Sequence, residues 1–350
     1  MNNKKIKIAF IGVGSMGQCA HLKNYVLIPE CEVVAICEIR EKLGRLVAER
    51  YGIKKFYKNF YDMVKNEEFD GIVASQPFTR HYVILKEILK AKKPVFIEKP
   101  LASSVEIGEK IIEIIKEAKT WVMVGYHKRS DPASIYVKNL VDEFKNSKEI
   151  GKLKYIRITM PPGDWIAGGF RDLIKTDEKL PENIEYDPKP ENMNEDEFKE
   201  YIDFVNYYIH QVNFMRFILD EDYRVKFADK TKVLMVIESN SGIPGIIEMA
   251  PYTTSIEWEE KILICFEKGY IELLLPAPLA SNRPGKVKIY KDTPNPQTII
   301  PQFPWISAMY QQALNFIKAI KGEIKPPTLA EEALKDLKVA EEYLTLLKKS

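Results

Sequence analysis

Residues 6–17, IKIAFIGVGSMG, and residues 33–38, VVAICE, decide the fold of this chain. The first stretch is an apolar strand that runs into a glycine-rich turn, and the second is another apolar strand that ends in a carboxylate. A strand, a tight turn and the start of a helix direct backbone N–H groups and the positive end of a helix dipole at one point, where a pyrophosphate can bind. The two stretches together predict a dinucleotide site.

Each residue type in this unit has a physical reason to be there. Gly12 permits the turn, Gly14 lets the backbone approach the phosphates, and Gly17 lets the helix and the strand pack closely. Glu38 follows about 20 residues after the turn, where a carboxylate accepts the ribose hydroxyls of NAD and repels a 2′-phosphate. Arg40 partly offsets that charge, so the sequence favours NAD and leaves NADP open.

Short apolar strands alternate with helical stretches as far as Gly125. The expected strands lie at residues 71–75, 94–98 and 121–125, and residues 103–119 show the apolar stripe of a helix that packs on a core. Strands that alternate with helices form a parallel, doubly wound sheet. We therefore predict an α/β Rossmann-type parallel-sheet domain over residues 1–125.

Beyond Gly125 the pattern changes to long β-rich runs, several of them close neighbours in the sequence. Lys268-Gly269 has the composition of a hairpin turn, which favours antiparallel pairing. Residues 126–350 are therefore expected to form an α+β domain with a large, mainly antiparallel open sheet. The runs are LKYIRITM (153–160), KVLMVIES (232–239), GIIEMAPY (245–252), KILICFEKGYIELLLP (261–276) and KVKIYKD (286–292).

A long polar loop and three helices are also expected in this second half. Residues 176–197 bear prolines and many acids without apolar periodicity, which predicts a surface loop. Asn194 and Glu197 have the spacing of a capping box, and apolar residues then recur at helical spacing to about Leu219. Two terminal helices are expected at residues 308–321 and 329–348.

Composition excludes several classes of function. The chain has 350 residues with 52 Lys and Arg against 50 Asp and Glu, and no basic stripe recurs along a predicted helix, so a nucleic-acid partner is not expected. No apolar run approaches the length needed to span a bilayer, so no membrane partner is expected. The four cysteines show neither metal-binding spacing nor a disulfide framework, which predicts reduced thiols, a cytoplasmic protein and no metal site.

Side chains that carry chemistry should follow the parallel strands, because ligands of open α/β sheets bind outside the carboxyl ends of the strands. Lys99 stands out because Pro100 restricts the geometry of the residue before it. His210 is the second candidate, since it shares a helix face with Asn206 and Asn213 that is distinct from the apolar stripe. The alternatives are a solvated lysine and a structural histidine.

At this point the chain resembles the Gfo/Idh/MocA oxidoreductases, the relatives of glucose-fructose oxidoreductase and inositol dehydrogenase. The resemblance rests on GVGSMG (12–17), on the run from 75 to 102 with its Glu-Lys-Pro signature, on GYHKRSDP (125–132) and on the mid-helix histidine. It covers the chain to the terminal helices and is strongest up to about Pro132. It implies NAD(P)-dependent hydride transfer to or from a secondary alcohol of a sugar, cyclitol or related polyol. It also implies homodimers or homotetramers formed through the C-terminal sheet.

The resemblance assigns roles by position. Lys99 and His210 take the catalytic places, with His210 accepting the hydroxyl proton and Lys99 stabilising the alkoxide. Asp131 is a further substrate contact to be weighed against a loop anchor. The expected coenzyme contacts are Gly12, Gly14, Ser15, Met16, Gly17, Glu38, Arg40, Ser75, Gln76, Pro77, His81, Glu98 and Lys99. The expected substrate contacts are Lys99, Tyr126, Arg129, Asp164, Trp165, Asn206 and His210.

The chain also departs from the family pattern. The family often has a Gly-rich turn, then an aspartate four residues before the histidine and an acid three residues after it, whereas this chain has no such turn and carries Asn206 and Asn213 at those places. An amide orients an imidazole but supplies no countercharge. His210 is then either a weaker base, or Lys99 shares the proton transfer with Tyr126 or Tyr208.

Two other functions remain open on sequence alone. One is a redox-neutral, NAD-dependent glycoside-cleaving enzyme, in which oxidation at C3 of the sugar precedes elimination of the aglycone. The other is a non-catalytic NAD-binding regulator, because the same fold also serves binding roles.

Overall fold

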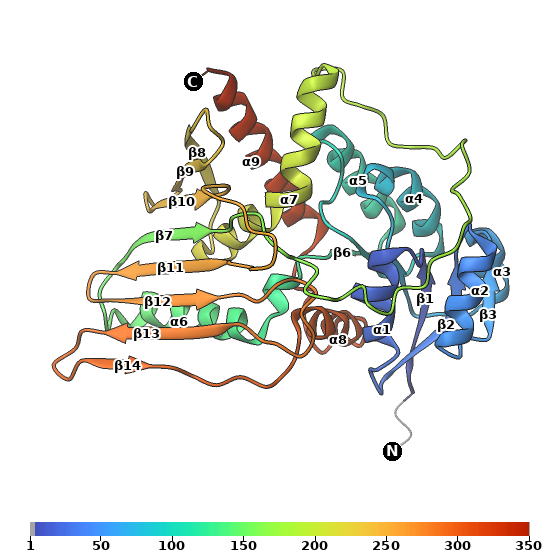
Figure 1. The fold of residues 1–350 in the computed structure, drawn as a ribbon, viewed down its shortest axis with the longest axis horizontal. Helices are drawn as coiled ribbons and strands as arrows, with labels where there is room; N and C mark the ends of the chain where they lie inside the picture. Colours follow the sequence, from blue (N-terminus) through green and yellow to red (C-terminus); the bar gives the residue numbers. More distant parts are fainter. Residues whose placement is uncertain (1–3, 350) are drawn as a thin grey trace. The chain divides into compact units, whose positions relative to one another are not determined.

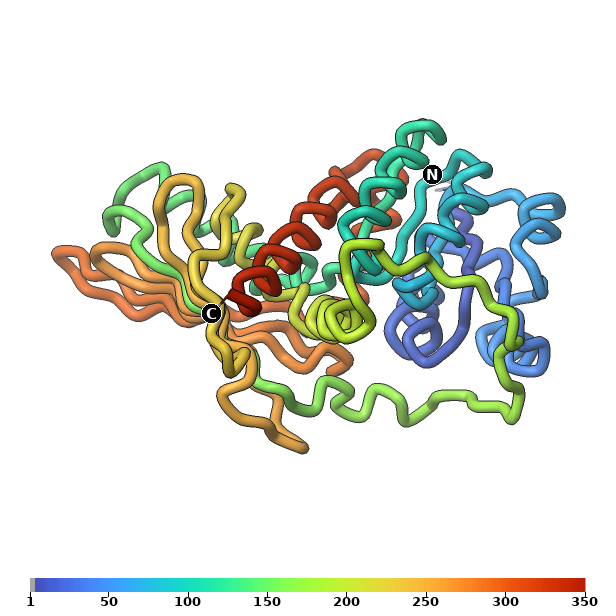
Figure 2. The backbone as a smooth tube through the Cα atoms, turned by 90° about the horizontal axis from the view of Figure 1, so that it is seen from above, coloured from blue at the N-terminus to red at the C-terminus, as the bar shows by residue number. Residues whose placement is uncertain are grey.

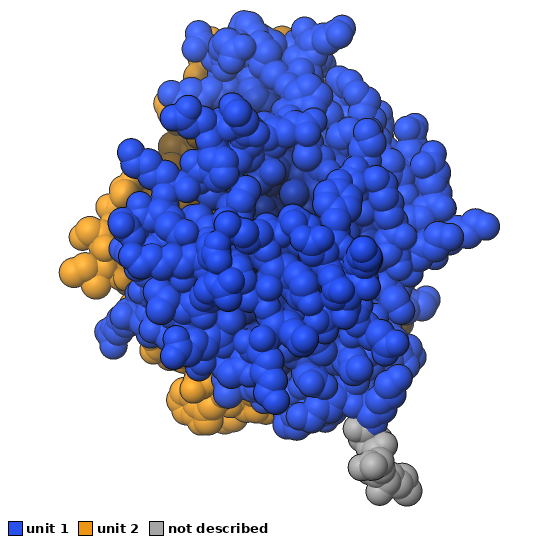
Figure 3. Space-filling view, turned by 90° about the vertical axis from the view of Figure 1, so that its right-hand side faces the viewer, with its two compact units in different colours: residues 1–126, 169–202, 312–337 blue, residues 127–168, 203–311, 338–350 orange. Residues whose placement is uncertain are grey.

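The computed structural model describes residues 4–349, which divide into two compact units. Unit 1 contains the chain up to residue 126 together with residues 169–202 and 312–337; unit 2 contains residues 127–168, 203–311 and the chain from 338 onward (Figure 3). The sequence predicts a single domain boundary after residue 125. In the structure, residues 169–202 and 312–337 follow that boundary in the chain but are still part of unit 1.

The sheet of unit 1 has the strand order β3-β2-β1-β4-β5-β6, and each neighbouring pair is parallel (Figure 1). This is the doubly wound order of a dinucleotide-binding fold, so the predicted Rossmann-type sheet is confirmed. The strands are β1 (Ile6–Ile11), β2 (Cys31–Cys37), β3 (Lys55–Tyr57), β4 (Gly71–Ala74), β5 (Val95–Ile97) and β6 (Val122–Val124).

The helices of unit 1 differ in one place from the expectation. The helix after the glycine turn is a π-helix, η1 (Gly17–Leu22), continued by a single α-turn, α1 (Lys23–Tyr25). The other helical elements between the strands are α2 (Glu41–Arg50), α3 (Phe60–Asn66), the 3₁₀ turn η2 (Phe78–Arg80), α4 (His81–Ile88), the 3₁₀ turn η3 (Leu89–Ala91) and α5 (Val105–Ala118).

Residues 312–337 join unit 1 because their apolar side chains complete its core. Helix α8 (Ala308–Ile320) carries Phe316, which is fully buried and makes edge-on ring contacts with Phe96 and Trp121. Leu329 then pairs with Met123 of β6, just before helix α9 (Ala330–Lys349) begins.

Unit 2 is built on a sheet in the order β14-β13-β12-β11-β7-β10-β9-β8. Only β7 and β10 pair in parallel, so the predicted mainly antiparallel sheet is confirmed, and β11 and β12 form the expected hairpin. The strands are β7 (Leu153–Thr159), β8 (Tyr223–Ala228), β9 (Leu234–Ser239), β10 (Pro244–Glu248), β11 (Lys261–Phe266), β12 (Gly269–Leu274), β13 (Lys286–Lys291) and β14 (Gln297–Ile299).

Helices α6 (Pro132–Ser147) and α7 (Glu195–Leu219) pack on the buried face of this sheet; the part of α7 from residue 203 belongs to unit 2. Phe144 of α6 contacts Phe266 of β11, and Tyr223 of β8 donates to the carbonyl of Val212 on α7. The capping box of α7 is present, since Asn194 and Glu197 exchange backbone-to-side-chain hydrogen bonds of 2.9 and 3.0 Å. Helix α6 was not expected from the apolar pattern.

No helix among residues 4–349 combines the length and the apolar character needed to cross a bilayer.

Candidate functional site

The glycine turn has the close packing that its sequence predicts. Gly12 has a φ of +86°, and a Cβ atom there would lie 2.3 Å from the carbonyl oxygen of Ser75. A Cβ on Gly17 would lie 2.2 Å from the carbonyl oxygen of Gly12, whereas one on Gly14 would meet only the Arg40 guanidinium, at 3.6 Å. The turn is therefore closed on the side of the sheet and open at Gly14, as a backbone that cradles phosphates requires.

Glu38 lies at the end of β2 and is buried against this turn. Its Oε2 accepts a 2.9 Å hydrogen bond from the Val13 amide. Its Oε1 accepts from the Arg40 backbone amide and from Arg40 Nε, at 3.2 and 2.8 Å. A second guanidinium nitrogen of Arg40 donates a 3.2 Å hydrogen bond to Oε2. A carboxylate has about four acceptor positions, and these four hydrogen bonds fill them. A ribose hydroxyl would therefore have to displace part of the Arg40 fork.

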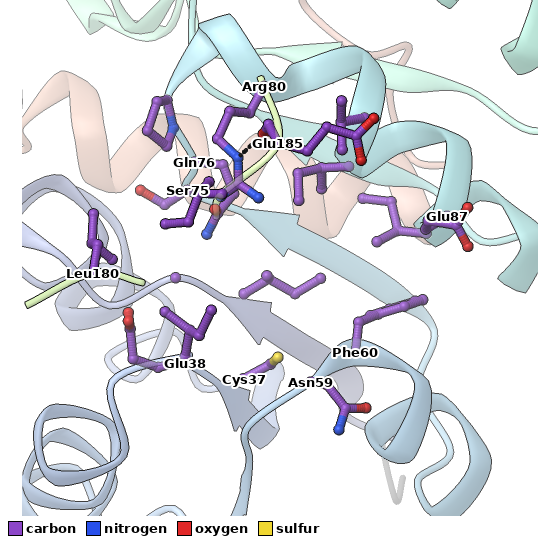
Figure 4. A pocket seen from close by; sticks show the side chains of 18 of the residues that line it. Cys37, Glu38, Asn59, Phe60, Ser75, Gln76, Arg80, Glu87, Leu180 and Glu185 are labelled. Atoms are coloured by element: carbon purple, nitrogen blue, oxygen red, sulfur yellow. Dashed lines mark hydrogen bonds between the residues drawn. The ribbon is translucent and has the colours of Figure 1, made fainter. Parts of the chain in front are cut away.

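A cavity of about 630 Å³ opens beside this carboxylate, within the size range of small-molecule sites. Its walls include Gly12, Gly14, Glu38 and Arg40, and across from them the chain after β4. Figure 4 shows Glu38 and Cys37 on one side of the cavity and Ser75 and Gln76 on the other, with Leu180 at its edge. Ser75, Gln76 and Pro77, which are among the expected coenzyme contacts, also line the cavity. Ser15, Met16 and Gly17 begin the helix behind the turn.

His81, expected at the coenzyme, lies outside this cavity. It is buried at the start of α4, and its Nδ1 is 3.0 Å from the carbonyl oxygen of Leu101. Burial lowers the pKa of His81, against the opposing effect of that hydrogen bond. These contacts are those of a neutral histidine that joins α4 to the chain after Pro100.

Glu98 and Lys99 lie at the carboxyl end of β5, and Lys99 is half-buried. The peptide bond between Lys99 and Pro100 is cis. Glu98 Oε1 forms a short hydrogen bond with Nε2 of His21, a buried residue of η1, while Oε2 accepts from the Lys99 amide at 3.1 Å. Burial alone would raise the pKa of Glu98, but His21 and Lys99 outweigh it and lower the pKa. His21 thus links the helix of the glycine turn to the Glu-Lys-Pro tripeptide, a link that no spacing in the sequence indicated.

In unit 2 the polar face of α7 packs on residues 127–130, a buried 3₁₀ turn. The rings of His127 and His210 meet edge-on with centroids 4.6 Å apart. Arg129 donates from Nε to the Asn213 side-chain oxygen at 2.7 Å and lies over the Phe217 ring at 5.0 Å. The face predicted from helical spacing therefore gathers two histidines, an arginine and an amide. The amide that replaces the family's second acid is bonded to a cation.

A second buried cluster lies beside this one and was missed from the sequence. Lys128 forms a short ion pair with Glu260, and both side chains are almost inaccessible to water. Gln211 of α7 donates to the same carboxylate at 2.7 Å, and the Lys128 ammonium lies over the Trp258 ring at 5.6 Å. Lys128 and Glu260 are 132 residues apart, so no local pattern could have paired them.

Of the remaining candidate residues, the two aspartates hold their own loops, and the others differ in exposure. Asp131 and Asp164 serve as local anchors: Asp131 accepts from the Ala133, Ser134 and Gly285 amides, and Asp164 accepts from the Ile166 and Ala167 amides at 3.0 Å. Asn206 is exposed on α7, Trp165 is half-buried and Tyr126 is buried. Tyr208 donates to the carbonyl of Met249 at 2.6 Å, and burial raises its pKa.

Parts of the chain are similar in sequence to a protein family and to individual dehydrogenases. Residues 6–126 match the family Gfo/Idh/MocA, described as an oxidoreductase family with an NAD-binding Rossmann fold. An inositol 2-dehydrogenase of Rubrobacter xylanophilus is 31% identical over 142 residues, which are 40% of this chain and 40% of that protein. A myo-inositol 2-dehydrogenase of Thermotoga maritima is 25% identical over 252 residues, 70% of this chain and 63% of that protein. The chain therefore matches less than two thirds of the length of either relative.

The fold is also found in solved structures. The crystal structure of aldose-aldose oxidoreductase from Caulobacter crescentus superimposes with a TM-score of 0.72 at 18% identity, covering 99% of this chain and 98% of that one. At this identity the likeness concerns the fold alone.

Proposed function

Because residues 6–126 match the Gfo/Idh/MocA oxidoreductase family, we propose that the chain is an NAD-dependent dehydrogenase that oxidises a secondary alcohol of an inositol- or sugar-like polyol, or reduces the corresponding ketone. The single observation that carries the proposal is the cradle at the end of β1. A Cβ on Gly12 would strike Ser75, Gly14 is open, and Glu38 stands at the edge of the same cavity.

The residues of this cradle fit a dinucleotide. The amides at the start of the helix after Gly14 would hold the pyrophosphate, since the first N–H groups of a helix have no partner within it. Glu38 would hold the adenosine ribose once Arg40 turns away, and the same arginine leaves NADP as a weaker alternative. When bound, the coenzyme supplies the hydride acceptor or donor.

The proposed proton chemistry belongs to Lys99 and His210. The Lys99 ammonium would hold the reacting hydroxyl and stabilise the negative charge that develops on its oxygen. His210 would take the hydroxyl proton as the C–H hydride leaves the same carbon, so that the alcohol becomes a ketone. Asn213 and its partner Arg129 would orient the imidazole without adding a negative charge to it. The meeting of Lys99 and His210 at one substrate stays a prediction.

The polyol substrate class has support from the relatives. Both relatives compared above are inositol 2-dehydrogenases. Arg129 and Trp165 are the groups of unit 2 that suit a hydroxylated ring, one as a hydrogen-bond donor and the other as a stacking platform. Asp164 would act through the loop that it holds, and Asn206 is accessible to a ligand at the helix surface.

We also propose that the chain forms a homo-oligomer through the outer face of its large sheet. The helices α6 and α7 pack on one face, and the side chains that point to the other face include Tyr155, Leu263 and Tyr270, none of which is fully buried. Arg157 and Glu272 lie on either side of Leu263, so this face combines apolar and charged side chains, as protein interfaces do. A second copy of the chain would cover it.

The test of the activity is a substrate panel. Purified protein is incubated with NAD and with myo-inositol, scyllo-inositol, aldoses and aryl glycosides, while reduced-nicotinamide absorbance and aglycone release are both followed. Accumulation of NADH with a cyclitol or sugar supports the proposal. Aglycone release without net NADH would replace it by the redox-neutral reaction, and NAD binding without turnover of any compound would replace it by a regulatory role.

A further inference from the structure

We propose that residues 177–188, here called the strap, complete the adenosine half of the coenzyme site and slow the release of the coenzyme. The inference rests on the proposed function, because it takes the cavity beside Glu38 as the place of the adenosine. The strap is part of the stretch that the sequence predicts as a plain surface loop. Figure 2 shows it as extended green chain that runs past the blue elements of unit 1.

One end of the strap is fastened to the start of α2. The Glu178 carboxylate accepts hydrogen bonds from the Lys42 and Leu43 amides, at 3.0 and 2.8 Å. The residue that precedes α2, Arg40, supplies no side-chain cap of its own. Since the first amides of a helix need an acceptor from elsewhere, Glu178 acts as the cap of α2 from 136 residues away. Asp177 adds an ion pair of 2.8 Å with the Lys42 ammonium.

The other end is fastened in the same way to the start of α4. The buried Asp187 carboxylate accepts from the Tyr82 and Val83 amides, at 3.2 and 3.1 Å, and the Asp187 amide donates to the Thr79 carbonyl at 2.7 Å. Again the preceding residue, Arg80, offers no side-chain cap. Its guanidinium Nε instead donates to the Glu185 carbonyl at 2.7 Å, the bond drawn in Figure 4.

Between these two attachments the strap forms part of the cavity wall. Leu180, Ile184 and Tyr186 line the cavity together with Glu38 and Gln76. The two helices that the strap joins, α2 and α4, follow β2 and β4, whose carboxyl ends bear Glu38 and Ser75. An adenosine held by those strand ends would therefore have the strap along one side. Its departure would require at least one of the two caps to break.

The strap is also suited to opening. It has no helix or strand of its own, and most of its residues other than Asp187 are exposed or half-buried. A segment with few buried apolar contacts opens at a lower free energy than the core it lies on. The two carboxylate caps hold this segment beside a bound ligand, and because the segment has few other buried contacts it can open to release the ligand.

The test is the rate at which the full-length protein releases NADH, measured by stopped-flow fluorescence after mixing with excess NAD. The variant is the double substitution Glu178→Ala with Asp187→Ala, which removes both caps. The matched control is Glu191→Ala, an exposed acid of the same loop outside the strap. We expect the dissociation rate constant to rise at least tenfold in the double variant and to stay within twofold of wild type in the control. An unchanged rate in a folded double variant overturns the inference.

A second measurement on the wild-type protein keeps the inference testable if the double variant does not fold. Hydrogen exchange of the peptides that cover residues 177–188 is compared with and without saturating NAD. Slower exchange on NAD binding supports the strap as part of the site, and unchanged exchange overturns it. If wild-type protein binds neither NAD nor NADH, the proposed function fails and the inference with it, whereas binding that the strap does not affect overturns the inference alone.

Discussion

Substitutions at two glycines of the turn should affect different properties, one the stability of the fold and the other the binding of a coenzyme. In Gly12→Ala the new Cβ would sit 2.3 Å from a carbonyl oxygen on a backbone with a φ of +86°. Strain of this kind costs about 1–3 kcal/mol before the clash is counted. In Gly14→Ala the nearest atom is a guanidinium nitrogen at 3.6 Å, which is ordinary contact.

We therefore expect Gly12→Ala to lose at least ~2 kcal/mol of unfolding free energy and Gly14→Ala to lose less than ~1 kcal/mol. Gly14→Ala should nevertheless bind NADH at least tenfold more weakly, because its Cβ stands where the backbone approaches the phosphates. Urea unfolding and NADH titration measure the two effects. A Gly14→Ala variant that binds NADH like wild type would show that the cradle is not the phosphate site.

Lys99 is the residue on which the proposed chemistry depends. Lys99→Met keeps most of the apolar stem and removes the ammonium, so kcat/KM for the best polyol should fall by about 10²–10³, whereas the Kd of NADH should rise by a smaller factor through the loss of one coenzyme contact. The matched control is Lys116→Met, an exposed lysine of α5 in the same unit. Steady-state rates and NADH titrations of the two variants decide the question. If Lys99→Met retains the wild-type rate, the proposed mechanism is wrong.

At the scale of the elements, Asp131 joins the start of α6 to the loop at Gly285 and makes unit 2 sensitive to pH. Burial raises the pKa of Asp131 from 3.8 to about 6, although three backbone amides oppose the change. Between pH 3.8 and about pH 6, Asp131 keeps its proton in the folded protein but has lost it in the unfolded chain. The free energy of unfolding therefore falls as the pH rises through this window, by roughly 3 kcal/mol in all.

Asp131→Asn removes this titration and leaves an oxygen that can accept from the same amides. From pH 4 to pH 7 the stability of this variant should therefore rise relative to wild type by about 3 kcal/mol. Glu143→Gln, an exposed acid of α6, is the control and should follow the wild-type profile. Urea unfolding at several pH values measures the difference. Parallel profiles for wild type and Asp131→Asn would contradict the prediction.

The elements also show what the sequence can and cannot predict. Helix α5 and the start of α7 were predicted because their signals are local: an apolar stripe in one, and in the other the reciprocal bonds of Asn194 and Glu197. Helix α6 was missed although Asp131-Pro132 is a good start signal, because its polar residues obscure the apolar period. The caps supplied by Glu178 and Asp187 were beyond prediction, since each joins residues more than a hundred positions apart.

The candidate site likewise combines features that local sequence signals predict with contacts between residues far apart in the chain. The glycine turn, Glu38 and the polar face of α7 follow from spacing, and the structure brings Arg129, Asn213 and His210 together in unit 2. The bond between His21 and Glu98 depends on how η1 lies against β5. No single sequence reports that arrangement.

At the scale of the whole molecule, the outer face of the large sheet carries the proposed assembly. Leu263 on β11 lies between Arg157 on one neighbouring strand and Glu272 on the other, and Tyr270 stacks on Tyr290 nearby. An apolar centre with charges among its neighbours is the composition of an interface rather than of a solvated sheet. Both copies would present the same face, so that each substitution acts twice in a symmetric dimer.

Leu263→Asp should therefore separate the oligomer into monomers, because it removes two apolar side chains from the centre of a two-fold interface and adds two carboxylates there, each opposite the Glu272 carboxylate of its own sheet. Leu46→Asp, at a 39% exposed leucine of α2 in unit 1, introduces the same charge away from the sheet and should leave the mass unchanged. Size-exclusion chromatography with light scattering gives the mass of each variant, and circular dichroism establishes that both are folded. A wild-type protein that is already a monomer at micromolar concentration, or a folded Leu263→Asp variant that keeps the wild-type mass, would show that this face is not where two copies meet.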